Sequence, residues 1–458
     1  MSGGIYDVEK ARTDPAGASV AAGGGAGRPS QRPDPVRLAL KKLIPAGSLF
    51  LPVFFITALW MYGALYQTSQ HAHNLNVLVI DFDGGSVGAA LLAAVRSLNG
   101  QKTLPTFVIA NASSITHDEA LHTVFDGEYW GAVFATEGAT NRFEAALAGG
   151  SAAAAYNASQ GLEYSGLEVR YPSAWSGVVL SALLRVLQTT AHIFNAQTVA
   201  PLLASGTALT PPAAQVVVNP LGSTYINLTP FSFGSRIVLN TIGFVYPFLF
   251  QFFFLLALNG IFTTSGAYRN LSLKRHLTLR LCISIPWTLA TSLCVASWAV
   301  MFDESYDIKA KNFFALWAVL WIFSTITFDT FDILTTWVPP AFLAYLTINV
   351  IIMSVSAVIW PIELANRFYR IHYVFPSHAT WSTMITIFGN GTVNRLYRDL
   401  PILAAWLVVL KCGVVLSLRK RAREGVAVAG GTAVAPPTQS AGERKAAPSA
   451  RSLWDEEK

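Results

Sequence analysis

Residues 44–66 read IPAGSLFLPVFFITALWMYGALY. An apolar run of this length is enough to cross a hydrocarbon core of ~30 Å as a helix. It follows Arg37, Lys41 and Lys42, begins too deep in the chain for a removable signal peptide, and lacks a clear small-residue cleavage site. We therefore expect residues 44–68 to form the first transmembrane helix and to act as a signal anchor.

The composition also indicates a membrane protein. Hydrophobic residues make up 52% of the chain and charged residues only 13%, whereas an ordinary soluble domain has roughly 25% charged residues. The mean hydropathy is +0.43. These values exclude a disordered or purely water-soluble protein. The net charge of +6 comes from basic residues beside the apolar runs, where they fix orientation, so we expect no nucleic-acid partner.

Five further apolar runs follow in the C-terminal half, at residues 237–262, 279–302, 312–334, 340–361 and 401–418. With the first run they predict an α-helical polytopic membrane protein with six transmembrane helices, one plus five. Basic residues cluster after the second and the sixth runs, so the positive-inside tendency places these clusters and both termini in the cytosol. The clusters are Arg269, Lys274, Arg275 and Arg280, and then Arg419, Lys420, Arg421 and Arg423.

Residues 69–236, between the first two helices, are expected to form an extracytosolic α/β domain. Residues 76–81, NVLVID, read as a buried strand. Helical and strand patterns then alternate, which favours a βαβ order. The expected helices are 89–98 and 117–125, and the expected strands are 106–109 and 129–134.

Two features of this domain carry further expectations. Asn111-Ala112-Ser113 and Asn157-Ala158-Ser159 are sequons, so Asn111 and Asn157 are candidate glycosylation sites on a domain outside the cytosol. The longer helical stretch at 176–201 has one central charge, Arg185. It either packs against the rest of the domain or lies near the membrane.

The remaining segments are two tails, a membrane domain and one loop. Residues 1–43 and 419–458 are rich in small and polar residues and are expected to be disordered cytosolic tails. Residues 237–418 form the expected five-helix transmembrane domain. Its loop 362–400 carries arginines on the predicted outer side, against the positive-inside tendency, so this loop either re-enters the membrane or lies on its interface. These arginines are Arg367, Arg370, Arg395 and Arg398.

Asp329 and Asp332 are the acidic residues of the fourth expected span. Their i, i+3 spacing puts both carboxylates on one helical face. Carboxylates inside a membrane are costly and often functional, so the two residues are candidates for an intramembrane ion or proton relay. The alternative is that both lie in water at the cytosolic end of the helix.

Other chemistry has little support in the sequence. His372 and the segment Pro376-Ser377-His378 resemble, faintly, the Pro-Ser-x-His element of membrane lipid phosphatases, but the partner segments of that chemistry are missing. The histidines are too scattered for a metal site. Cys282, Cys294 and Cys412 lie in apolar runs and predict no disulfide framework. No phosphate-binding Gly-rich Lys loop occurs. We expect no enzyme activity, metal or cofactor.

Short motifs occur in a recognisable order along residues 45–418. Together with the one-plus-five layout they resemble the fungal nitrosoguanidine-resistance protein family, a domain family of unassigned biochemical function. The layout is also similar to that of phage-infection-type proteins and type-2 ABC exporter permeases. The motifs are WMYGALY at 60–66, VLVIDFD at 77–83, DGEYWGA at 126–132, ALNG at 257–260, YVFP at 373–376, IFG at 387–389 and LAAW at 403–406.

The resemblance implies a fungal membrane protein, at the plasma membrane, that confers resistance to nitrosoguanidine and other toxic compounds. Export or transport of such compounds is the first expectation. The alternative is a non-transporting regulator of membrane lipid asymmetry or of another transporter, because family members have been connected with lipid asymmetry. The expected partners are membrane lipid, a small toxic compound or lipid substrate, and other membrane proteins. The family supplies no catalytic residues.

Overall fold

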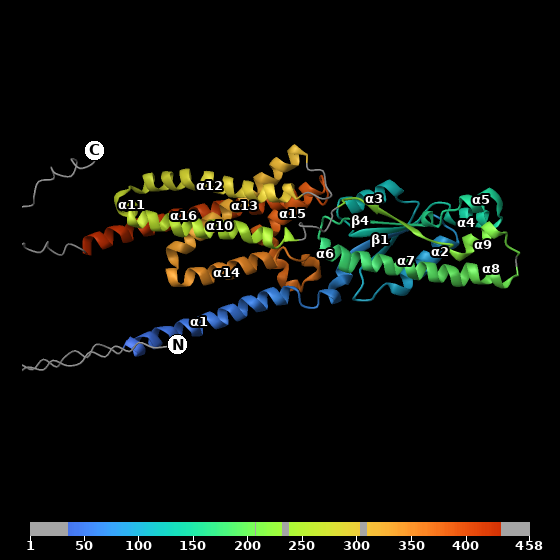
Figure 1. Cartoon of the computed structure of the whole chain (residues 1–458), viewed down its shortest axis with the longest axis horizontal. Coiled ribbons are helices and arrows are strands. Elements are labelled where there is room, and N and C mark those ends of the chain that lie inside the picture. The colour runs from blue at the N-terminus through green and yellow to red at the C-terminus, as the bar shows by residue number, and fades with distance from the viewer. Residues whose placement is uncertain (1–34, 207, 231–237, 303–308, 432–458) are drawn as a thin grey trace, which may run out of the picture. The chain divides into compact units, whose positions relative to one another are not determined.

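The computed structural model describes residues 35–206, 208–230, 238–302 and 309–431 (Figure 1). The chain divides into two compact units, residues 1–52 and 53–458. The first unit contributes the start of helix α1 (Pro35–Ala64), and the second holds the other described elements. Residues 35–43, predicted as part of a disordered tail, are therefore helical. The rest of that tail lies outside the described residues.

Six helices among the described residues are long and apolar enough to cross a membrane, which fits a polytopic membrane protein. They differ from the six predicted runs in one member. The run 340–361 forms α14 (Pro340–Ser356), of only 17 residues, and a helix at Pro172–Ala204 takes its place in the set. The six are Gly47–Ala64, Pro172–Ala204, Ile242–Thr264, Leu273–Met301, Ala310–Trp337 and Leu396–Arg423.

A five-stranded sheet forms the centre of the α/β domain, with the strand order β2-β1-β3-β4-β5. Neighbouring strands are parallel except β3 and β4, which are antiparallel. Val79 of β1 lies opposite Ile109 of β2 and Val133 of β3. The strands are β1 (Asn76–Asp81), β2 (Thr106–Ala110), β3 (Gly131–Ala135), β4 (Leu162–Gly166) and β5 (Ser223–Asn227).

The continuous apolar run of β1 is explained by its burial on both faces. Val77, Leu78, Val79 and Ile80 are each at most 1% exposed, as expected for a strand with helices on both sides. Figure 1 shows α3 above the strands and α7 below them. The helices of this domain are α2 (Ser86–Leu98), α3 (His117–Phe125), α4 (Ala139–Leu147), α5 (Gly150–Ala155), α7 (Ser181–Phe194) and α9 (Pro211–Val218).

The helix at Pro172–Ala204, which comprises α6 (Pro172–Ala174), α7, α8 (Ala200–Ala204) and two π-helical turns, covers the sheet. Its α7 segment packs along α2. Leu183 and Val186 of α7 are fully buried, whereas Leu184 is 40% exposed. One face of α7 is thus apolar and buried, and the other carries Arg185, Gln188 and Thr189. This pattern is typical of a helix that packs on a sheet in water.

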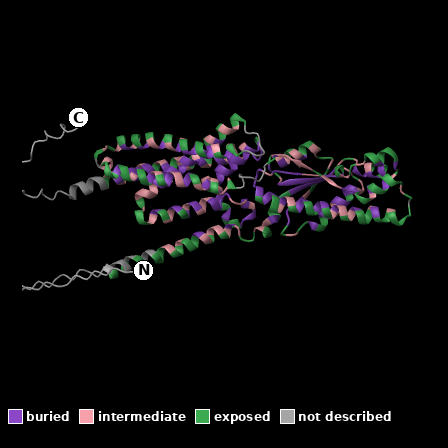
Figure 2. Ribbon diagram, in the orientation of Figure 1, coloured by how far each residue is buried: buried purple, intermediate pink, exposed green. Residues whose placement is uncertain are grey.

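The membrane helices pack around α13 (Ala310–Trp337). This helix contacts α10 (Ile242–Thr264), α12 (Leu273–Met301), α15 (Pro376–Phe388) and α16 (Leu396–Gly431). Figure 2 shows buried residues in the interior of this bundle and again along the strands of the α/β domain. Phe323 of α13 packs edge-on against Phe244 and Phe248 of α10, with ring centroids 5.2 and 5.6 Å apart. Such aromatic pairs hold the two helices in register. The short helix α11 (Ala267–Asn270) lies between α10 and α12 in the chain. Residues 419–431, predicted as disordered tail, thus continue α16.

The loop before α16 is more ordered than its sequence indicates. It forms two short 3-10 helices, η6 (Ile362–Leu364) and η7 (Arg367–Val374), and the helix α15 (Pro376–Phe388). Polar α15 is buried against α13 and α16. Its hydroxyls bond to the carbonyl groups of its own preceding turn, as Thr380 does to Pro376 and Thr383 does to Ala379, so the helix buries few free hydroxyls.

Candidate functional site

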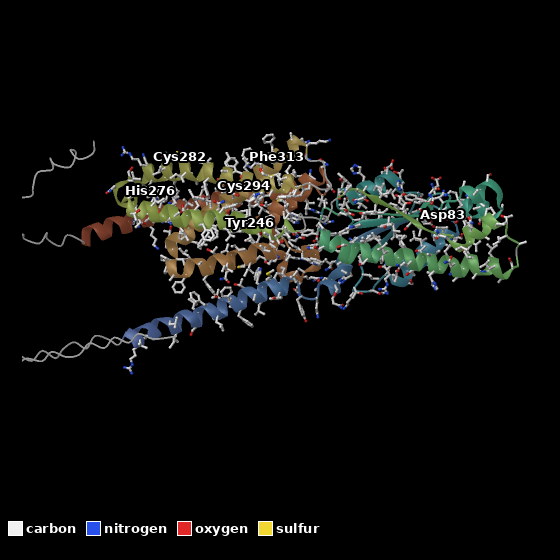
Figure 3. All side chains as sticks on the ribbon, viewed as in Figure 1. Asp83, Tyr246, His276, Cys282, Cys294 and Phe313 are labelled. Atoms are coloured by element: carbon white, nitrogen blue, oxygen red, sulfur yellow. The ribbon has the colours of Figure 1, made fainter. Side chains whose placement is uncertain are left out.

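A cluster of charged side chains lies inside the helical bundle, near the end of α12 that His276 marks in Figure 3. Asp332 of α13 is at its centre and is fully buried. Arg280 of α12 donates from Nε to Asp332 Oδ2 at 3.1 Å and from Nη2 to Oδ1. Arg421 of α16 donates from Nη1 to the same Oδ1 at 3.0 Å. One carboxylate therefore faces two guanidinium groups.

Neighbouring polar groups complete the hydrogen bonding of this cluster. Asn259 Oδ1 accepts from Arg280 Nη2 at 2.9 Å and from the Tyr268 hydroxyl at 2.7 Å. Arg421 Nη2 donates to Thr335 Oγ1 at 2.8 Å and to the Asp332 carbonyl oxygen at 3.1 Å. Buried charges are tolerated where their partners are this complete. The cluster thus joins α12, α13 and α16 structurally.

Asp329, one turn earlier on α13, has a different partner. Lys411 Nζ of α16 lies 3.0 Å from its Oδ1 and 2.9 Å from its Oδ2. The Asp329 side chain is 2% exposed, but that of Lys411 is 39% exposed. A single flexible lysine that reaches the surface holds a carboxylate less firmly than two buried arginines do. The lysine ammonium group is a point charge on a flexible chain, whereas a guanidinium group offers several donors in a fixed planar geometry.

A cavity of about 190 Å³ adjoins both acidic residues. Five apolar side chains, four charged side chains and Ser284 form its wall. The cavity therefore combines an apolar surface with two ion pairs, Arg280–Asp332 and Lys411–Asp329. Its lining residues are Leu277, Arg280, Leu281 and Ser284 of α12, Phe328, Asp329 and Asp332 of α13, and Lys411, Val414 and Val415 of α16.

The structure places Asp329 and Asp332 together inside the bundle. The alternative expectation, that both lie in water at the helix end, is wrong, because their exposed fractions are 2% and 0%. Each carboxylate instead has its own basic partners. A role for Asp329 and Asp332 as a relay stays a prediction.

The basic partners were missed by the sequence analysis. Arg280 and Arg421 were assigned to cytosolic flanks, but they are 2% and 9% exposed. Lys411 lies within the predicted run 401–418 and received no role. A signal was present, because a cation inside an apolar span demands an anion nearby, and Asp329 and Asp332 are the acids of the adjacent span.

The residues that resemble a phosphatase element are arranged differently from a nucleophile and its base. Ser377 Oγ donates to the Ser354 carbonyl oxygen at 3.0 Å. His372 Nε2 accepts from Trp60 Nε1 at 3.2 Å, and burial lowers the pKa of His372 to about 4. Nδ1 of His378 lies 3.4 Å from the Ala357 carbonyl oxygen. The contacts of Ser377 and His378 hold α15 to the end of α14, and the contact of His372 joins η7 to α1.

The sequon residues of the α/β domain are accessible. Asn111 and Asn157 are exposed, and each accepts a bond from the backbone N–H two residues later, at 3.1 Å. The turn after β1 is structural, since Asp83 Oδ1 accepts from Thr140 N at 2.8 Å. Figure 3 shows Asp83 far along the molecule from His276 and the buried charge cluster.

Comparisons with known proteins agree on a membrane family without an assigned activity. A family described as "Protein of unknown function (DUF3533)" matches residues 48–412. An uncharacterized endoplasmic reticulum membrane protein of Saccharomyces cerevisiae is 21% identical over 401 residues, which cover 81% of this chain and 78% of the yeast protein. No solved structure matches the chain significantly. The chain is a multi-pass membrane protein.

Proposed function

We propose a function from the premise that this chain belongs to the family described as protein of unknown function DUF3533. The protein exports small toxic compounds, nitrosoguanidine among them, and so confers resistance, as a transporter and not as an enzyme. The observation that carries this proposal is the cavity of about 190 Å³ among α12, α13 and α16, with the Asp329–Lys411 pair on its wall. Membrane lipid and the exported compound are its expected partners.

The chemistry of the cavity suits an amphipathic compound with N–H donors. Guanidine-type N–H groups pair with a carboxylate through two parallel bonds, and the aliphatic wall accepts an apolar body. Leu281 lines the cavity and is 36% exposed on the bundle surface. A compound dissolved in the membrane therefore has a route to Asp329.

Exchange of partners at Asp329 supplies a mechanism. A carboxylate buried in lipid without a counter-charge is costly. When Lys411 swings towards the surface, Asp329 must take up a proton or an N–H group of the compound. When Lys411 returns, it displaces that group. Asp332 stays bound to its two arginines throughout, because both are buried and each donates to its carboxylate.

The direction of α16 supports an extracytosolic α/β domain. The chain enters α16 beside that domain, where Val393 N donates to the Phe125 carbonyl oxygen at 3.1 Å. The helix then runs to Arg419, Lys420 and Arg423. The domain and the basic end thus lie at opposite ends of the bundle, and basic ends face the cytosol.

Plasma-membrane residence is part of the proposal, although the name of the yeast relative places that protein in the endoplasmic reticulum. Export from the cell requires residence at the surface. Fluorescence microscopy of the tagged full chain tests this directly. Signal confined to the endoplasmic reticulum would contradict export across the plasma membrane.

Retention of a labelled toxic compound, with a fluorescent phospholipid followed in parallel, tests the activity in cells with and without the gene. Export predicts that cells with the gene retain less compound while lipid movement is unchanged. Equal retention in both cell types would contradict it.

The second candidate is a non-transporting regulator of membrane lipid asymmetry or of another transporter. The aliphatic side chains of the cavity favour it, since Leu281 lines the cavity and is 36% exposed, which suits contact with an acyl chain. The same experiment separates the two candidates. Changed lipid movement with unchanged compound retention would support the regulator.

A further inference from the structure

A second cavity, of about 100 Å³, lies where the α/β domain meets the membrane helices. Most of its lining side chains are basic or carry hydrogen-bond donors. They come from segments far apart in the chain, before α6, in η6 and η7, in α15, and at the start of α16. The lining residues are Arg170, Tyr171, Glu363, Tyr373, His378, Ser382, Ile385, Val393, Arg395 and Arg398.

Arg170 is a buried arginine without a hydrogen bond of normal length to oxygen among the described residues. It is 6% exposed, and its guanidinium group stacks on Trp130, 3.7 Å from the ring centroid. Its contacts to oxygen are long, at 3.5 Å to the Gly127 carbonyl and 3.6 Å to Glu363 Oε1. An ordinary N–H···O bond measures about 2.7–3.2 Å. A buried guanidinium has five N–H donors, and these contacts use them poorly.

The chain holds Arg170 in this position rigidly. Gly166, at the end of β4, lies so close to the Trp175 ring that no Cβ fits there. Tyr171 then packs edge-on against Trp381 of α15, with ring centroids 6.1 Å apart. Arg170 thus lies between two anchored points. Packing against Trp130 therefore orients the Arg170 side chain towards the cavity. Its ion pair with Glu363 is too long, at 3.6 Å, to do so.

The cavity has an excess of positive charge. Arg398 donates from Nε to Asp399 Oδ1 at 2.8 Å, which compensates one of the arginines. Glu363 compensates only one of the other two, Arg170 and Arg395, so one positive charge is left. Arg398 and His378 lie in the first turns of α16 and α15, so two positive helix ends add to this potential.

The neutral side chains around the cavity remain hydrogen-bond donors. Burial, followed by the charge of Glu363, raises the pKa of Tyr171 far above its usual value. Burial also raises the pKa of Tyr373, and Glu363 adds to that effect. Both phenols therefore keep their protons at neutral pH. Ser382 adds a hydroxyl group.

We infer that this cavity binds a phosphate group, with Arg170, Arg395 and Tyr373 as its ligands. Guanidinium groups match the geometry and charge of phosphate oxygens. A volume of about 100 Å³ holds a group the size of several water molecules, which suits one tetrahedral oxyanion. Because the ligands come from the α/β domain and from the membrane segments, the bound group joins the two parts. This site is independent of the export proposal.

The phosphate group has two possible sources, inorganic phosphate and a phospholipid headgroup. Phe368, Ile371 and Val374 of η7 are 62%, 48% and 58% exposed, and Tyr373 of the same helix lines the cavity. An exposed apolar surface beside the cavity suits contact with lipid. The experiment therefore includes both sources.

Thermal unfolding of the purified full chain tests the site without any transport assay. One arm adds inorganic phosphate, and the other adds phosphatidic acid, with diacylglycerol as the matched lipid that lacks a phosphate group. We expect a raised melting temperature with one or both phosphate sources. Arg395→Gln, at a half-exposed residue, should weaken the apparent affinity about tenfold, the effect of one lost charge-assisted hydrogen bond. Folded Arg170→Gln protein should show an apparent affinity lowered by at least the same factor.

Arg185→Gln, on the exposed face of α7, is the matched control and should bind as the wild type does. A response to inorganic phosphate identifies a free anion, and a response to phosphatidic acid alone identifies a headgroup. No response to either source, or an equal response in Arg395→Gln and in the wild type, would overturn the inference.

Discussion

Asp329 and Asp332 are one turn apart on α13, but their partners make their roles different. Asp332 accepts from Arg280 and Arg421, both buried. Asp329 has one partner, Lys411, which reaches the surface. The first arrangement resists change because two buried guanidinium groups share the carboxylate, whereas the second allows exchange. We therefore assign a structural role to Asp332 and propose the exchange of partners at Asp329.

Asp332→Asn should destabilise the protein strongly. It leaves two buried guanidinium groups without their shared carboxylate, and breaking a buried ion pair in this way costs about 3–5 kcal/mol. Thermal unfolding of the purified protein in detergent measures the effect. Asp118→Asn, whose side chain is 98% exposed, is the control and should melt as the wild type does. Equal melting temperatures for all three proteins would show that the cluster is not structural.

His378 should make stability depend on pH. Burial, helped by the charge of Arg398, lowers its pKa from 6.5 to about 4. As the pH falls, the unfolded chain binds the proton first, so stability is full above pH 6.5 and is lost towards pH 4. The loss approaches about 3 kcal/mol. Melting measured from pH 7.5 to 4.5 should fall less in His378→Gln, and an unchanged pH slope would contradict this assignment.

Among the secondary-structure elements, those with the strongest sequence patterns were predicted correctly. The strand at 76–81 and the helix at 117–125 form as predicted, β1 and α3, because a continuous apolar run and the capping box at Thr116 are local signals. Strands β4 and β5 were missed. Their sequences, LEYSG and STYIN, are short and polar, and they form strands through pairing partners distant in the chain.

Pro172–Ala204 shows the limit of hydropathy as a criterion. Its length and composition would allow a membrane span, but α7 packs on α2 through one face only. Similarly, polar α15 is buried in the bundle because its hydroxyls bond to carbonyl groups, those of Thr380 and Thr383 within the helix and that of Ser377 to Ser354. In both cases packing partners decide the location, and a single sequence does not reveal them.

Neighbouring lysine substitutions in α7 test this assignment. Leu183 is fully buried and Leu184 is 40% exposed. Leu183→Lys should prevent stable folding, since a buried unpaired charge costs several kcal/mol, and Leu184→Lys should be tolerated. Yield and melting temperature of the two variants provide the measurement. Comparable damage from both would indicate a helix surrounded by lipid.

For the whole molecule, the proposed topology puts the basic end of α16 and the α/β domain on opposite sides of a membrane. The lysines and arginines of the sequence predict this polarity. The sequence could not predict the cavities, because each needs side chains from three or more segments. Nor could it separate Arg280 and Arg421, which serve the buried cluster, from the basic residues that set orientation.

Glycosylation tests the sidedness. Asn111 and Asn157 are exposed on the α/β domain and should carry N-linked glycans in a eukaryotic host. Glycosidase treatment should then increase gel mobility, and the shift should be smaller in the double variant Asn111→Gln/Asn157→Gln, which keeps the further sequons Asn227-Leu228-Thr229 and Asn390-Gly391-Thr392. Ala450→Asn, which creates a sequon in the C-terminal tail, should add no glycan. A glycan at position 450 together with none on the domain would reverse the topology.

We propose that the protein carries small toxic compounds through the cavity beside Asp329. The most direct measurement is the flux of a labelled nitrosoguanidine across proteoliposomes that contain the purified full chain. We predict flux with the wild type and with Asp118→Asn, and a loss of at least about tenfold with Asp329→Asn, because one charge-assisted contact is removed. Flux that is unchanged in Asp329→Asn, or absent with the wild type, would contradict the account.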